Sequence, residues 1–328
     1  MLSDTCALIL AGGEGTRMKS NRPKVLAEVL FKPLIRWVLD AVKQAGIEDI
    51  CVVTGSKREY VEDYLKTLDF PVETVYQSQR LGTGHAVMMA EDFLKRHSGQ
   101  SVVILNGDAP FISADTITAA LEAGKNSACT IISAALENPT GYGRIVRQAD
   151  GCSVEAIVEE KEATEEIRRI REINSGAYRF ETDVLLEALS KVTKSEKTGE
   201  YYLTDTVEII KNSGRSVLAF QADNADSVLG ANDCVQLSQL NEIARQRVLE
   251  RHMKNGVNIP CADGVIIGTD VTIGANAVIL PASVIRGNTV IGSYCEVGPG
   301  VLLENCTLND GTRVSGGSYC GETFLPKN

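Results

Sequence analysis

The chain has 328 residues, 44% of them hydrophobic and 23% charged, which is the composition of an ordinary globular protein with room for two cores. Its formal net charge of −10 argues against general nucleic-acid binding, which needs a basic surface, although a few local cations could still hold a small anion. The nine cysteines form no C-x-x-C pair, and neither a signal peptide nor a long apolar span is visible, so we expect free thiols, a cytoplasmic location and no membrane partner.

The first half of the sequence alternates strand and helix patterns. Apolar runs predict strands at 5–12, 49–55, 72–77 and 100–108, and periodic apolar positions predict helices at 33–46, 58–68 and 82–96. Strands that alternate with helices predict a parallel sheet covered on both faces. Ligands bind such sheets outside the carboxyl ends of the strands, which is where residues 11–17, Gln77 and Asp108 fall.

The stretch LILAGGEGTRMKSNRPK, residues 8–24, follows the first predicted strand. Glycines let a backbone approach a ligand closely and let several N–H groups point at one anion, and Arg17 and Lys24 add positive charge nearby. Neither common phosphate-binding pattern is matched, because Met18 stands where a third glycine is needed and no Gly-Lys-Ser/Thr follows. A glycine-rich turn without a ligand is the alternative interpretation.

Two further segments follow in chain order. Residues 142–160 read as two strands joined by an Asp-Gly turn, which predicts a hairpin. A long helix is predicted from about Asp233 to Asn255, with apolar positions such as Val235 and Leu240 at helical spacing and Gly256 at its end. We expect this helix to connect two domains.

A six-residue repeat begins near residue 265. Aliphatic residues recur at an unbroken spacing of six, at Ile267, Ile273, Ile279, Ile285, Ile291, Val297 and Leu303. This period predicts a parallel β-helix whose aliphatic side chains stack along its inside.

Several motifs recur here in the order of a known family. They are LAGGEGTRM with RPK, QRLGTGHA, GDAPFIS, PTGYGRI, IVEEKEAT, EINSGAY, GEYYLTD and GANDCVQL. With them the chain resembles, over nearly its whole length, the bacterial N-acetylglucosamine-1-phosphate uridyltransferase family. The resemblance implies an α/β fold: a Rossmann-like nucleotidyltransferase domain with a mostly parallel sheet at 1–230, a connector helix at 231–256, and a short left-handed parallel β-helix at 257–328.

The resemblance also implies a reaction, in which UTP and N-acetylglucosamine 1-phosphate give pyrophosphate and UDP-N-acetylglucosamine, a compound of peptidoglycan and cell-wall biosynthesis. Such a site must neutralise two polyanions and align them, work for which the cations of Arg17 and Lys24 are suited. Mg²⁺ takes hard oxygen ligands, and by resemblance these are Asp108 and Asn232. A turn role for Asp108 and a helix cap at Asn232 are the alternatives.

Substrate contacts are implied in the same way. The substrate-binding residues are Leu10, Ala11, Gly12, Gly13, Lys24, Gln77, Gly82, Thr83, Gly143, Glu159, Asn174 and Asn232. The positions up to Thr83 face uridine, apart from Lys24, whereas Gly143, Glu159 and Asn174 face the sugar. Glu159 lies in an acidic run, which usually marks a solvated surface. His85 is interpreted as packing support, since an already ionised phosphate needs no base.

Two departures from the family pattern stand out. Bifunctional members carry a longer β-helix that acetylates glucosamine 1-phosphate from acetyl-CoA, whereas the array here ends near residue 314, so we expect acetyl transfer to be absent. Glu14 stands in the glycine-rich loop at a position that is often basic or neutral, and we expect it to weaken anion attraction slightly.

Other interpretations of the whole chain stay open. The same chemistry could act on another sugar 1-phosphate or nucleotide, such as N-acetylgalactosamine 1-phosphate. A nonenzymatic regulatory subunit is a different class, against which the presence of Arg17, Lys24, Asp108 and Asn232 together argues. The β-helix leads us to expect a homotrimer.

Overall fold

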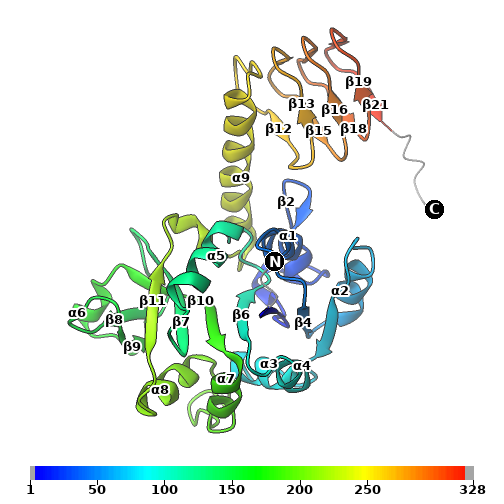
Figure 1. Ribbon diagram of the computed structural model, residues 1–328. Coiled ribbons are helices and arrows are strands. Elements are labelled where there is room, and N and C mark those ends of the chain that lie inside the picture. Colours follow the sequence, from blue (N-terminus) through cyan, green and yellow to red (C-terminus); the bar gives the residue numbers. More distant parts are fainter. Residues whose placement is uncertain (1–3, 322–328) are drawn as a thin grey trace. The chain divides into compact units, whose positions relative to one another are not determined.

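The computed structural model describes residues 4–321, and the chain divides into two compact units (Figure 1). Unit 1 contains the residues up to Ala27 together with Leu34–Asp233. Unit 2 contains Glu28–Pro33 and the residues from Cys234 onward. No pattern in the sequence had indicated that Glu28–Pro33 would belong with the C-terminal part of the chain.

A single mixed sheet forms the centre of unit 1, and its main path runs β11-β7-β10-β6-β1-β4-β5. The strands are β1 Thr5–Ala11, β4 Ile50–Thr54, β5 Glu73–Tyr76, β6 Ser101–Asn106, β7 Cys129–Ala135, β10 Glu172–Glu181 and β11 Val217–Gln221. All neighbours on this path pair in parallel except β10, which runs antiparallel to both β6 and β7. The predicted mostly parallel sheet is therefore confirmed.

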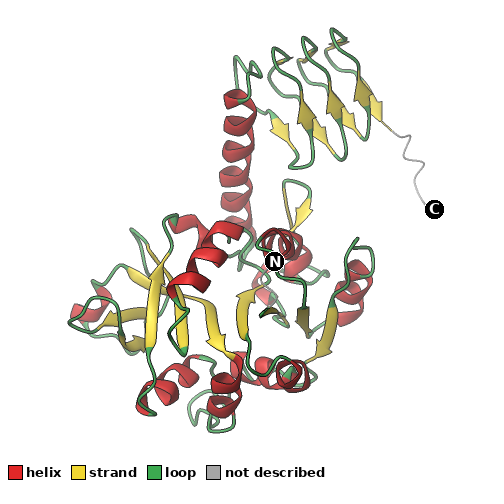
Figure 2. Ribbon diagram, in the orientation of Figure 1, coloured by secondary structure: helices red, strands yellow, loops and turns green. Residues whose placement is uncertain are grey.

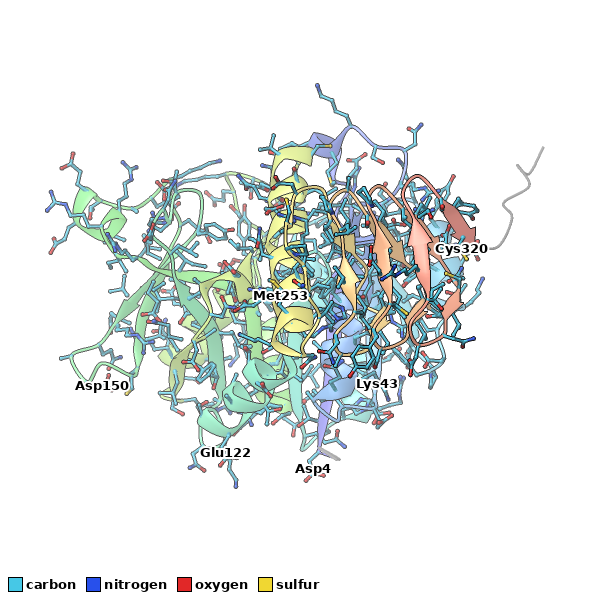
Figure 3. All side chains as sticks on the ribbon, turned by 90° about the horizontal axis from the view of Figure 1, so that it is seen from above. Asp4, Lys43, Glu122, Asp150, Met253 and Cys320 are labelled. Carbon is cyan, nitrogen blue, oxygen red and sulfur yellow. The ribbon has the colours of Figure 1, made fainter. Side chains whose placement is uncertain are left out.

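A hairpin extends this sheet from β10. Its strands are β8 Arg144–Arg147 and β9 Val154–Val158, as the Asp-Gly turn predicted. The Asp150 carboxylate accepts hydrogen bonds from the N–H groups of Cys152 and Ser153, which closes the turn. Figure 3 shows Asp150 at the outer end of this hairpin.

Helices cover both faces of the sheet (Figure 2). They are α1 Leu34–Gln44, α2 Arg58–Leu65, α3 Thr83–Met89, α4 Glu91–Arg96, α5 Ala114–Ala123, α6 Glu165–Arg168, α7 Thr182–Leu189 and α8 Thr204–Asn212. Two apolar clusters result, one uniting β1 with α1, α2 and α5, and the other packing α3, α4, α7 and α8 on the opposite face. Strands buried on both faces are typically continuous apolar runs, as β1 is.

The single helix predicted over 82–96 is wrong, because the structure breaks it into α3 and α4 at Ala90. Ala90 leaves helical geometry at φ −91° and ψ 18°. Glu91 and Asp92 follow directly, in the first turn of α4, where acidic side chains favour a new helix start.

Unit 2 consists of a long helix, a short hairpin and a parallel β-helix. The helix is α9 Cys234–Lys254, and the hairpin joins β2 Glu28–Val29 to β3 Lys32–Pro33. Asn241 of α9 accepts a hydrogen bond from the N–H of Leu30 through its Oδ1 (3.0 Å) and donates one from Nδ2 to the carbonyl of Glu28 (3.2 Å). One side chain thus attaches the hairpin to α9.

The β-helix stacks its short strands in three parallel sheets, of order β12-β15-β18-β21, β13-β16-β19 and β14-β17-β20. The strands are β12 Ile266–Ile267, β13 Thr272–Ile273, β14 Val278–Ile279, β15 Val284–Arg286, β16 Val290–Ile291, β17 Glu296–Gly298, β18 Leu302–Glu304, β19 Thr307–Leu308, β20 Arg313–Ser315 and β21 Tyr319–Gly321. Ile267, Ile285 and Leu303 stack in register and are fully buried, so the predicted inward-facing repeat is confirmed. The last described coil ends with β21, which contains Cys320 (Figure 3).

Candidate active site

The glycine-rich loop begins where β1 ends, at the carboxyl edge of the sheet. Its path depends on two close approaches. A Cβ added to Gly55, at the end of β4, would lie 2.3 Å from the carbonyl oxygen of Gly12, and one added to Gly15 would lie 2.7 Å from Cβ of Lys24. Gly15 also has a φ of 63°, a conformation that costs little only without a side chain. Glycine therefore lets the loop lie against β4 and return toward Lys24.

Lys24, Asp108 and Asn232 form the centre of the candidate site. Lys24 opens the 3₁₀ helix η2 (Lys24–Leu26), Asp108 follows β6, and Asn232 closely precedes α9. The Lys24 ammonium pairs with the Asp108 carboxylate and donates a hydrogen bond to Oδ1 of Asn232 at 3.1 Å. The side chains of Lys24 and Asp108 are 14% and 21% exposed, so their charges meet in a partly desolvated place. Lys24 and Asn232, which are 208 positions apart in the sequence, are therefore in direct contact.

The Asp108 and Asn232 oxygens that contact the Lys24 ammonium also fit the requirements of a small hard cation. Both contact a single positively charged nitrogen, which shows that a carboxylate and an amide oxygen converge on one point. Mg²⁺ usually takes one or two such oxygens from the protein and the remainder from water and phosphates. Among residues 4–321 no group of three or more His, Cys, Asp or Glu side chains could hold a metal ion.

Gln77 is held firmly at the end of β5. The residue is 5% exposed, and its Nε2 donates to the carbonyl of Gly82 at 3.0 Å and lies 3.1 Å from Nδ1 of His85. Its Oε1 faces Gly12, since a Cβ on that glycine would approach this oxygen to 2.9 Å. The His85 ring stacks on Tyr201. His85 therefore supports Gln77.

The turn after Gln77 packs against residues 200–203. Gly82 has a φ of 95°, and a Cβ there would lie 2.5 Å from the carbonyl oxygen of Tyr201. The N–H of Gly84 donates to that same carbonyl at 2.8 Å, and the Thr83 hydroxyl accepts from the N–H of Leu203 at 3.1 Å. The Thr83 hydroxyl therefore stabilises this turn, and the backbone of residues 82–83 lies beside Gln77.

The three residues predicted to face the sugar are brought together around the β8–β9 hairpin. The N–H of Asn174 donates to the carbonyl of Gly143 at 2.8 Å, and a Cβ on Gly143 would lie 3.3 Å from Oε1 of Glu159. The Asn174 amide is oriented by Tyr178, whose hydroxyl accepts from Nδ2 at 2.9 Å. Burial, and to a smaller degree Glu162, raises the pKa of the Glu159 carboxyl above its ordinary value.

A hydrogen bond links the sugar-side residues to the strand end that precedes Asp108. Asn106, the last residue of β6, donates from Nδ2 to the carbonyl of Ser175, next to Asn174, at 3.2 Å. Burial raises the pKa of the Tyr142 hydroxyl, and the Asp108 carboxylate adds to the rise.

Arg17 does not join this cluster of side chains. It lies in the 3₁₀ helix η1 (Thr16–Met18) and is exposed. Leu10, Ala11 and Gly13 are the other loop residues predicted to touch a substrate, and of these only Gly13 is exposed. Leu10 and Ala11 belong to β1, so their backbone rather than their side chains would face a ligand at the sheet edge.

Some supporting residues were not predicted from the sequence. Arg144 is 1% exposed, pairs with Glu160 at 2.6 Å and so anchors the hairpin beside Glu159. Lys57 and Arg80 contact the glycine-rich loop from neighbouring strand ends. The motifs PTGYGRI and IVEEKEAT contain Arg144 and Glu160, whereas no local signal marks Lys57.

Comparisons with known proteins agree with this arrangement. The family model for nucleotidyl transferases matches residues 6–246, and the model for six repeats of the bacterial transferase hexapeptide matches residues 270–305. The crystal structure of UDP-glucose pyrophosphorylase complexed with UDP-glucose superposes with a TM-score of 0.61 at 21% identity, over 74% of this chain and 99% of that one, which shows a shared fold.

Curated relatives match over most of the chain. A protein of Caldanaerobacter subterraneus subsp. tengcongensis is 43% identical to this chain, and the match covers 95% of this chain and 67% of that protein. A protein of Acetivibrio thermocellus is 46% identical, and the match covers 94% of this chain and 66% of that protein. Both are named bifunctional protein GlmU. The chain therefore spans about two thirds of the length of these relatives.

Within residues 4–321, no helix is both long and apolar enough to cross a membrane.

Proposed function

Because the chain belongs to the nucleotidyl transferase family, we propose that it transfers a uridylyl group from UTP to N-acetylglucosamine 1-phosphate, giving UDP-N-acetylglucosamine and pyrophosphate. The observation that carries this proposal is the meeting of Lys24, Asp108 and Asn232 beside the glycine-rich loop. The choice of nucleotide and sugar rests on the motifs and on relatives named bifunctional protein GlmU.

Two cationic side chains would neutralise the negative charge of the two phosphate groups that react. Lys24 lies within the centre itself and would stabilise charge on the transferring phosphoryl group. Arg17, exposed on the loop, would contact the outer phosphates of UTP together with the N–H groups of residues 12–15. The attacking oxygen belongs to an ionised phosphate, so the site needs alignment and charge neutralisation rather than a general base.

Asp108 and Asn232 are the residues that would hold Mg²⁺. At this position a bound Mg²⁺ would supply positive charge that neutralises the phosphates. Lys24 already contacts both side chains, which keeps their oxygens directed to one point. This arrangement supports magnesium dependence of the transfer.

The substrate sides would divide along the sheet edge. Gln77 and the backbone at Gly12 and Gly82 offer fixed polar groups for the edge of a uracil ring. Glu159 and Asn174 offer a carboxylate and an amide for sugar hydroxyls and the acetamido group.

We also propose a cytoplasmic location, where free thiols such as the nine of this chain are typical. The absence of acetyl transfer in these 328 residues stays a prediction.

A pyrophosphate-release assay with UTP, Mg²⁺ and a panel of sugar 1-phosphates tests the proposal. We expect turnover with N-acetylglucosamine 1-phosphate, and a fall in kcat/KM of about 100-fold or more in Asp108→Asn, which removes charge without changing shape. Asp115→Asn, at an exposed position of α5, is the matched control and should stay near wild type.

Each contrary outcome removes a different part of the proposal. A preference for glucose 1-phosphate by about tenfold would contradict the sugar assignment. Full magnesium-dependent turnover by Asp108→Asn would contradict the metal site. No pyrophosphate with any pair of substrates would favour a regulatory subunit that has kept the fold.

A further inference from the structure

The signature loop, defined here as residues 12–23 between β1 and η2, is held by two side chains that the proposed reaction does not use. Nζ of Lys57 donates hydrogen bonds to the backbone carbonyls of Asn21 at 2.9 Å and Ser20 at 3.3 Å. The guanidinium of Arg80 pairs with the carboxylate of Glu14. One contact holds each end of the loop.

These two side chains come from adjacent strand ends of the same sheet. Lys57 follows β4, which pairs with β1, and Arg80 follows β5, which pairs with β4. Both line a cavity of about 290 Å³ together with Arg58, Tyr76 and Gln77. Gln77 is the proposed uridine residue, so the contacts that hold the loop adjoin the nucleotide side of the site.

The backbone at Lys57 is strained. Its φ is 56°, in the left-handed region that a residue with a side chain rarely adopts, and it stands directly before α2. Such strain persists where the surrounding structure holds a residue in place, and it occurs preferentially at functional sites. At this position the ammonium reaches two carbonyls of a loop that is exposed from Lys19 to Arg22.

The Arg80 contact also explains an unusual residue. Glu14 places a negative charge in a loop that the proposed function assigns to a triphosphate. The guanidinium of Arg80 neutralises that carboxylate, so its repulsion of phosphate is reduced while the pair joins the loop to the residues after β5. The charge that appeared unfavourable in the sequence becomes a point of attachment in the structure.

We infer that Lys57 and Arg80 are positioning residues that keep the signature loop in its nucleotide-binding form. The inference rests on the proposed function for its link to UTP, but the attachment of the loop can be measured without any reaction. Each contact lowers the free energy of the ordered loop, and a ligand binds more weakly when the competent form is less populated. Loss of either contact therefore acts on UTP binding more than on the chemical step.

Four variants test the inference: Lys57→Met, Lys57→Arg, Arg80→Glu, and Arg80→Glu combined with Glu14→Arg. We expect Lys57→Met and Arg80→Glu to raise KM for UTP about 3- to 10-fold with kcat within about twofold of wild type. Amide hydrogen exchange of residues 13–22 should become faster in both. Lys57→Arg and the charge-swapped double variant should restore slow exchange and a low KM.

Arg96→Glu is the matched control. Arg96 and Glu73 form a surface ion pair at 2.5 Å with side chains 55% and 44% exposed, nearly the same as the 51% and 44% of Arg80 and Glu14. This control should leave both KM for UTP and exchange in the loop unchanged.

Unchanged exchange of residues 13–22 in Lys57→Met and Arg80→Glu would overturn the inference, and so would a fall in melting temperature with no change in KM. Failure of the proposed function has a separate signature. If the wild type turns over no UTP, the exchange measurement alone still decides whether the two residues hold the loop.

Discussion

Four glutamates near the hairpin, within residues 155–162, illustrate how the fold separates side chains of one kind. Three of them meet cations: Glu155 meets Lys211, Glu160 meets Arg144, and Glu162 meets Lys197. Glu159 instead lies against Gly143, and burial raises the pKa of its carboxyl. Period-2 alternation would place Glu155 and Glu159 on the same face of β9, so it does not separate them, and Glu159 itself is exposed. What distinguishes Glu159 is its position beside Gly143, and its contact with a sugar stays a proposal.

A pair of glycines provides a test at the residue scale. In Gly55→Ala the new Cβ would lie 2.3 Å from the carbonyl oxygen of Gly12, a backbone atom that cannot move without shifting the loop. We expect a loss of stability of about 1–3 kcal/mol, the usual cost of overpacking, in thermal or denaturant unfolding.

Gly13→Ala is the control for that measurement, because a Cβ there would meet nothing within 4 Å. It should unfold at nearly the wild-type temperature. Equal stability of the two alanine variants would show that the strand ends tolerate separation and that the close approach is not required.

The helix α9 shows what an element adds to its residues. Its buried positions Leu240, Ala244, Val248 and His252 recur every four residues and form a narrow stripe, with Leu249 beside it. Val235, expected on the apolar face, is 68% exposed. The helix as predicted is present, but packing buries only part of its apolar positions, so helical periodicity alone overestimated the buried face.

His252 makes this stripe sensitive to acid. Burial, with a smaller contribution from Arg251, lowers the pKa of its imidazole to about 4. An unfolded histidine binds a proton near pH 6.5, so between about pH 6.5 and 4 the unfolded state binds more protons, and stability falls as the pH falls. We expect His252→Leu to lose less stability between pH 7 and 4.5 than the wild type, by at most roughly 3 kcal/mol.

Chemical unfolding at both pH values, followed by circular dichroism, measures this difference. The wild type and the variant losing the same stability between pH 7 and 4.5 would show that another group is responsible.

At the scale of the whole molecule, the β-helix bears exposed apolar side chains. Val290, Tyr294 and Tyr319 are 43%, 69% and 51% exposed. Val290 lies on β16 and Tyr319 on β21, which belong to two different sheets of the β-helix. We propose that the β-helix forms a homotrimer, as the six-residue repeat led us to expect, and that exposed apolar side chains such as Tyr294 lie in its interface.

Sedimentation of the full chain tests this assembly. A chain of 35.3 kDa should sediment as a species of roughly 106 kDa if three copies close around an axis. Tyr294→Asp should shift the population toward the single chain, whereas Tyr60→Asp, at a position that is 56% exposed in unit 1, should not. A single-chain mass for the wild type at micromolar concentration would contradict the trimer.

The local features of this protein were predictable from its sequence. The strands at 5–12, 49–55, 72–77 and 100–108, the helices α1 and α2, the hairpin at 142–160, the long helix and the six-residue repeat each depend on patterns within a few consecutive residues, so they are visible without knowledge of the fold. The motifs likewise identified which residues to expect in a site, and their resemblance to a family supplied roles that local patterns could not.

Tertiary structure alone decided which of those residues meet. Lys24 and Asn232 are 208 positions apart, Lys57 and Arg80 reach the signature loop from other strands, and Glu28–Pro33 join unit 2. Such contacts depend on strand order and on the close packing of backbones at strand ends, which are set by the whole core and not by neighbouring residues. For that reason the elements could be predicted one by one, whereas the site exists only where the packed sheet brings their ends together.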